Sequence, residues 1–182
     1  VQKDKTRSLI YRKVKQESLL IVNDTADKLY LTLDPLFNFE GGKDLADTTG
    51  KSVYKNTRGF LVRGHIGKKF AFESSFYENQ ATYVNYIEQY IRSTNNLFPQ
   101  VANYNYNVIP GQGRAKEFET SSLLRKAGFK TKGYDYAMAS GYISYSPIKR
   151  LNIQLGHGKH FVGDGYRSLL LSDNAFNYPY AR

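Results

Sequence analysis

The chain of 182 residues contains no cysteine, no tryptophan, one methionine and five prolines. The absence of cysteine excludes a disulfide scaffold, a thiolate metal site and a cysteine nucleophile. No apolar run approaches the roughly 18 residues that a transmembrane helix requires, so a spanning helix is excluded and a spanning β-barrel is left open. The length itself suits one domain.

Aromatic residues and positive charge are abundant instead. The 16 Tyr and 11 Phe residues supply much of the apolar surface, which suits strands and interfaces. The 26 Lys and Arg residues outnumber the 16 Asp and Glu residues, so the net charge is +10. This charge favours anionic partners such as nucleic acid, acidic glycans or lipid headgroups.

Alternation of apolar and polar residues predicts strands. In residues 28–40, Leu and Phe occupy one parity and mostly polar residues the other, which gives a strand with one dry and one wet face. Pro35 marks a bend or an edge in that strand. Two hairpins follow the same rule. The first has its arms at residues 60–66 and 70–79 and its turn at residues 67–69. The second has its arms at residues 134–145 and 151–156 and its turn at residues 146–149.

The remaining segments are long connections. Residues 81–133 begin with Tyr83, Ile87, Tyr90 and Ile91 at helical spacing, which predicts one amphipathic helix, and continue as Asn- and Tyr-rich coil and a basic stretch. A second long connection spans residues 159–177. Connections that alternate short and long are typical of transmembrane β-barrels, and a soluble antiparallel sandwich is the alternative.

The number of predicted strands bears on the domain organisation. About five or six strands are visible, whereas a closed single-chain barrel needs about eight. We therefore expect residues 28–182 to be the N-terminal part of a longer antiparallel barrel, preceded by a helical or irregular lead-in at residues 1–27.

The segment 156–173 is rich in glycine and in residues that could carry chemistry. It contains neither a phosphate-binding loop nor a dinucleotide fingerprint. His157, His160 and Asp164 suggest a metal site, but residues three apart on a strand point to opposite faces. Ser168, Ser172 and Asp173 lack the nucleophile elbow of a hydrolase. A salt-bridge network of Asp164, Arg167 and Asp173 that fills a polar interior is the favoured interpretation.

Several motifs resemble the capsule-assembly Wzi family, and more closely its relatives associated with gliding bacteria. The resemblance runs from about residue 29 to the end of the chain. Residues 161–173 (FVGDGYRSLLLSD) carry its most specific part, and the other motifs are residues 56–59 (NTRG), 66–70 (IGKKF), 75–80 (SFYENQ), 110–114 (PGQGR), 134–136 (YDY) and 141–147 (GYISYSP). The resemblance implies an outer-membrane β-barrel with a polar, obstructed lumen that holds capsular or extracellular polysaccharide without catalysis.

These observations predict an all-β, antiparallel transmembrane barrel with one helix in a long loop, located in the outer membrane. We expect no enzyme activity, no cofactor and no metal. Tyr166, Arg167 and Asp173 are the predicted ligand-binding residues. The expected partners are outer-membrane lipid, surface polysaccharide and other envelope proteins, without nucleic acid. The alternatives are a structural subunit of an envelope motility or secretion complex and a soluble basic sheet that binds nucleic acid.

Overall fold

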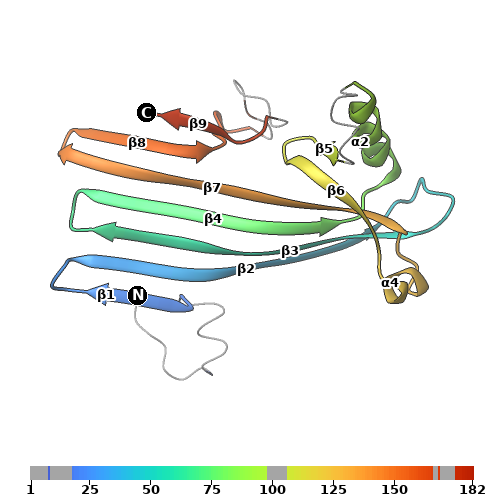
Figure 1. Ribbon diagram of the computed structural model, residues 1–182, viewed down its shortest axis with the longest axis horizontal. Coiled ribbons are helices and arrows are strands. Elements are labelled where there is room, and N and C mark those ends of the chain that lie inside the picture. The colour runs from blue at the N-terminus through green and yellow to red at the C-terminus, as the bar shows by residue number, and fades with distance from the viewer. Residues whose placement is uncertain (1–7, 9–17, 98–105, 166–167, 169–174) are drawn as a thin grey trace.

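The computed structural model describes residues 8, 18–97, 106–165, 168 and 175–182, and nine strands in this part of the chain form one antiparallel sheet (Figure 1). The strands are β1 (Leu20–Asp24), β2 (Leu29–Lys43), β3 (Ser52–Ile66), β4 (Phe70–Ala81), β5 (Tyr106–Ile109), β6 (Gly113–Glu119), β7 (Lys132–Ile148), β8 (Leu151–Gly158) and β9 (Tyr178–Ala181). Two helices accompany them, α2 (Asn85–Leu97) and α4 (Ser122–Lys126). The all-β antiparallel class and the predicted helix are therefore confirmed.

Strands β1, β2, β3, β4, β7, β8 and β9 lie side by side in that order. On the side away from β4, β7 has two partners: its first residues, Lys132 to Asp135, pair with β6, and its later residues pair with β8. Strand β5 extends the β6 branch. The described sheet is open, with β1 at one edge and β9 at the other (Figure 1).

Short turns and long connections lie at opposite ends of the strands (Figure 1). The turns 25–28, 67–69 and 149–150 follow β1, β3 and β7 at one end. The connections 44–51, 82–131 and 159–177 leave β2, β4 and β8 at the other end, and the longest one carries α2, β5, β6 and α4. The predicted alternation of short and long connections is confirmed.

The strand register gives the sheet two different faces, because residues opposite one another in an antiparallel pair share a face. One face, here called the apolar face, is largely exposed; Phe37 and Phe39 are 80% and 70% exposed. Its residues include Leu20, Val22, Leu29, Leu31, Leu33, Phe37, Phe39, Phe60, Val62, Ile66, Phe70, Phe72, Phe76, Ile143, Tyr145, Ile153 and Leu155.

The opposite face, the polar face, carries hydroxyl, amide and charged side chains that bond to one another. Thr57 Oγ1 donates to Asn79 Oδ1 at 2.7 Å, and the hydroxyls of Ser75 and Ser140 are 2.8 Å apart. Arg63 and Glu73 lie within 3.9 Å on neighbouring strands of this face. The period of two read from the sequence therefore separates two chemically distinct surfaces.

The buried core lies on the polar face, near the long connections. Here α2 and the β5–β6 hairpin pack against the last residue of β4 and the first residues of β7. Ile91 of α2 is fully buried, while Tyr86 and Tyr90 are exposed, so one stripe of the helix faces the sheet. The core residues are Ala81, Ile91, Ile109, Ala115, Tyr134 and Tyr136, with Tyr83 and Ile87 against them.

Three expectations about local structure were wrong. Residues 20–24 are strand β1, so this part of the lead-in 1–27 is neither helical nor irregular. The long connection contains strands β5 and β6 and a second helix, α4, in addition to the predicted α2, and the described strands number more than five or six. The second hairpin turn is residues 149–150, because β7 continues through Pro147 with an irregularity between Tyr145 and Ile148.

Among the described residues, no helix is both long enough and apolar enough to cross a membrane.

Candidate functional site

The residues predicted to bind ligand, Tyr166, Arg167 and Asp173, lie outside the described residues, as does Ser172. The proposed network of Asp164 with Arg167 and Asp173 therefore stays a prediction. Asp164 itself is exposed. The hydroxyl of Ser168 accepts a hydrogen bond from the backbone N–H of Val162 at 3.1 Å, which ties the loop to itself.

The two histidines of the segment 156–173 have different neighbours. His157 makes an edge contact with Phe176, with ring centroids 6.5 Å apart. His160 contacts Tyr178 and Tyr180, and its Nδ1 lies 3.0 Å from the Tyr178 hydroxyl. Within the described part of the chain, no three His, Cys, Asp or Glu side chains gather to hold a metal ion.

A pocket of about 240 Å³ lies on the polar face, between the start of α2 and the ends of β2 and β3. We call it the α2 pocket. Its polar wall is Glu40 and Lys55, whose side chains form an ion pair at 3.4 Å. The lining residues are Glu40, Gly41, Gly42, Val53, Tyr54, Lys55, Thr82, Tyr83, Val84 and Ile87.

Tyr83 lines the α2 pocket, and two tyrosines of β7 hold its side chain in place. Its hydroxyl donates to the hydroxyl of Tyr136 at 2.9 Å, and its ring lies 6.0 Å from that of Tyr134. Burial raises the pKa of Tyr83, and the neighbouring Tyr136 adds to the shift. The phenol is therefore protonated at neutral pH and presents an uncharged aromatic surface.

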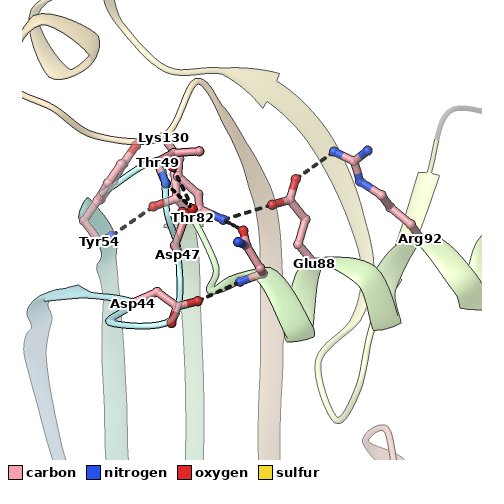
Figure 2. A network of polar contacts seen from close by, with 9 residues as sticks. Asp44, Asp47, Thr49, Tyr54, Thr82, Glu88, Arg92 and Lys130 are labelled. Carbon is pink, nitrogen blue, oxygen red and sulfur yellow. Dashed lines mark hydrogen bonds and ion pairs between the residues drawn. The ribbon is translucent and has the colours of Figure 1, made fainter. Parts of the chain in front are cut away.

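A network of polar contacts holds α2 over the sheet (Figure 2). At the start of the helix, the backbone N–H of Asn85 donates to the Asp44 carboxylate at 3.3 Å. The buried Lys130 donates to the Asn85 side chain and to Glu88 Oε2, the latter at 3.2 Å. Glu88 Oε1 also accepts from Arg92 at 2.7 Å. Two of the long connections, 44–51 and 82–131, are thus joined through one helix.

Asp47 belongs to the same network, in the loop between β2 and β3. Its Oδ1 accepts from the backbone N–H and the hydroxyl of Thr49 at 2.9 and 2.8 Å. These bonds hold the pKa of Asp47 below its ordinary value. A carboxyl with a lowered pKa stabilises the fold in its ionised form, so this contribution is present at neutral pH and is lost as the pH falls through the folded-state pKa.

The arrangement can bind a ring that is apolar on one side and polar at its edge. Tyr83 and Ile87 supply an apolar surface, and Glu40 and Lys55 supply an acceptor and a donor beside it. A pyranose has this combination of surfaces. The Glu40–Lys55 pair is solvent-accessible, whereas the Lys130–Glu88 pair is largely buried and acts on the position of α2.

Sequence reasoning did not identify the α2 pocket. The sequence pattern places Glu40 only on the wet face of a strand and Tyr83 only on the apolar stripe of a helix, and Lys55 lies outside the predicted strands. The signal that brings them together is the register of β2 against β3, where Glu40 pairs with Lys55. Register depends on the whole sheet and cannot be predicted from either segment alone.

Comparison of the chain with protein-family models, with curated proteins and with solved structures gives no match.

Proposed function

We propose that this chain forms part of an outer-membrane β-barrel that binds or organises surface polysaccharide without catalysis. The observation that carries the proposal is the difference between the two faces of the sheet. An exposed apolar face that runs across all the long strands is costly in water and is what a bilayer requires. The opposite face carries the polar side chains that suit a barrel lumen.

The dimensions of the apolar face support lipid as its neighbour. Along β3, the residues from Phe60 to Ile66 span about 20 Å, and along β2 those from Leu29 to Phe39 span about 33 Å. The apolar band of outer-membrane barrels is about 25 Å tall. On the same face, Arg58 and Glu78 form an ion pair at 3.0 Å opposite Phe37, so charge resumes on β3 and β4 where the apolar residues of those two strands end.

The open edges set a requirement for this proposal. A sheet edge in lipid would leave backbone N–H and C=O groups without partners, which costs several kcal/mol per group. The outer edges of β1 and β9 therefore need further strands, from the same chain or another one, before the sheet can close. The Wzi-like resemblance supports such a larger barrel.

Polysaccharide binding is proposed at the α2 pocket, which opens on the polar face beside the long connections. We expect the Glu40→Gln variant to bind a neutral surface glycan about tenfold more weakly than the unchanged protein, since it loses a charge-assisted hydrogen bond. The measurement is a titration of the detergent-solubilised protein with glycan fractions.

The matched control is Glu78→Gln, which removes another ion-paired, solvent-accessible carboxylate, here from the apolar face. It should leave glycan affinity unchanged. Equal losses in both variants, or the absence of saturable binding to any glycan, would contradict the lectin function. A chain that purifies as a stable monomer without detergent would contradict the membrane location.

The open edge of β1 gives specific support to a second candidate, a structural subunit of an envelope complex. All five residues of β1 are exposed, so this strand could pair with a strand of another protein. Co-purification of partner chains from native membranes would favour this function over a solitary barrel.

A further inference from the structure

Basic residues gather in the three short turns at one end of the sheet. Lys28 ends the first turn, Lys68 and Lys69 lie in the second, and Lys149 and Arg150 form the third. All five are exposed. We call them the cationic rim, and Figure 1 shows the three turns at the same end of the strands.

Backbone hydrogen bonds hold the three turns side by side. The N–H of Gly67 donates to the carbonyl of Lys28 at 2.8 Å, which joins the first turn to the second. The N–H of Ser146 donates to the carbonyl of Lys69 at 2.8 Å, which joins the second turn to the end of β7. The cations are therefore placed in a row along the sheet end, about 20 Å long if the strands β2 to β8 are about 4.8 Å apart.

The cationic rim is free to bind an external anion. None of its five side chains has an ion pair or hydrogen bond with another described residue. Asp27 lies in the first turn and Asp24 ends β1 just before it, and Asp24 accepts hydrogen bonds from the N–H groups of Ala26 and Asp27 at 2.9 and 3.3 Å. The rim therefore has a surplus of uncompensated positive charge.

Apolar residues begin directly beside these cations. Ile66 and Ile148 adjoin the turns and are 48% and 62% exposed. A trough of about 480 Å³ lies in the apolar face below the rim, where Ser74 and Gly141 leave space between larger side chains. Its lining residues include Phe70, Phe72, Ser74, Gly141, Ile143 and Leu155, and Phe70 directly follows Lys69.

We propose that the cationic rim binds the phosphate of an anionic phospholipid and that an acyl chain of the same lipid lies in the trough. The inference rests on the proposed membrane location and names the lipid that this end of the sheet selects. Charge complementarity argues for the headgroup, and the apolar trough beside it argues for a lipid, because a soluble polyanion would gain nothing from exposed Phe and Leu side chains.

The test compares phosphatidylglycerol with phosphatidylcholine, each titrated into the detergent-solubilised protein. We expect tighter binding of phosphatidylglycerol and a preference that weakens as salt is added. The double variant Lys68→Gln/Lys69→Gln should weaken phosphatidylglycerol binding on the order of tenfold and leave phosphatidylcholine unaffected. The matched control, Lys116→Gln/Lys126→Gln, removes two exposed cations from the opposite end and should change neither.

A second variant tests the trough. Ser74→Leu fills it at an exposed position and should weaken both lipids equally, because it affects the chain and not the headgroup. Equal affinity of the unchanged protein for both lipids, or an equal loss in the control variant, would overturn the lipid site while leaving glycan binding and detergent dependence intact. A protein that is soluble without detergent would instead overturn the membrane location itself.

Discussion

At the scale of single residues, the most informative side chain is Lys130, whose charge is buried between α2 and the loop before β7. Its side chain is 9% exposed and that of its partner Glu88 is 18% exposed. A buried charge is tolerated only when it is paired and hydrogen-bonded. Lys130 meets this condition through Glu88 and Asn85, and Glu88 in turn is shared with Arg92.

Because Glu88 has a second partner in Arg92, replacing Glu88 and replacing Lys130 should affect stability differently. We expect Glu88→Gln to destabilise the protein by about 2–3 kcal/mol, because it leaves the buried Lys130 ammonium with a neutral partner. Lys130→Met should cost less, since Glu88 keeps its hydrogen bond to Arg92 and the methionine fills the same space. The measurement is the free energy of unfolding from urea titration. A larger loss of stability in Lys130→Met than in Glu88→Gln would show that an unpaired Lys130 charge is not the main cost.

At the scale of elements, most of the long strands and β8 could be predicted from sequence, whereas β1, β5, β6, β9 and the first half of β3, from Ser52 to Gly59, could not. In β2 and β3 the side-chain period of two is carried by many residues, so the apolar and polar faces follow without knowledge of the partner strands. Pro35 fits the same reasoning, because β1 pairs with β2 only as far as Leu33 and leaves Pro35 on a locally unpaired edge.

The missed elements have too few residues to show a period. In β1, consecutive Leu20, Ile21 and Val22 carry no alternation, and a short apolar run does not distinguish a strand from a helix. The hairpin of β5 and β6 forms because its second arm pairs with the start of β7, a contact between distant segments. The α2 pocket could not be predicted for the same reason, because pairing between distant segments brings its residues together.

The strand β3 has a glycine, Gly59, at a position where β4 leaves no room for a Cβ. A Cβ on Gly59 would collide with the carbonyl oxygen of Phe76 and lie 2.7 Å from Tyr77 Cα, and both are neighbouring backbone. We expect Gly59→Ala to destabilise the protein by about 2–3 kcal/mol, because the backbone must shift. Its control is Gly67→Asn in the following turn, where φ is +59° and no heavy atom lies within 4 Å.

Asparagine adopts positive φ more readily than most residues, so Gly67→Asn should change stability little. Urea titration of both variants compares the two positions. A near-neutral Gly59→Ala would mean that β3 and β4 have more freedom to separate than their register indicates.

At the scale of the whole molecule, the sheet is ordered along two directions. Across its thickness, an exposed apolar face opposes a hydrogen-bonded polar face. Along β3 and β4, the cationic turn is followed by the apolar residues, then by the Arg58–Glu78 ion pair and the connections 44–51 and 82–131 that α2 joins. The second ordering is the one that the proposed membrane location requires, because headgroups, acyl chains and the aqueous phase follow one another in the same sequence.

Adjacent residues of β7 test this arrangement directly. Ile143 lies on the apolar face, paired with Phe72 and Leu155, and Tyr142 lies on the polar face, paired with Glu73 and Gly156. In lipid, Ile143→Arg should cost about 2–4 kcal/mol and reduce the fraction of protein that folds into vesicles. Tyr142→Arg should fold nearly as well, because its guanidinium faces water and lies beside Glu73. If both variants insert equally, or if Ile143→Arg improves the yield of soluble protein, then the apolar face meets water or another protein and not a bilayer.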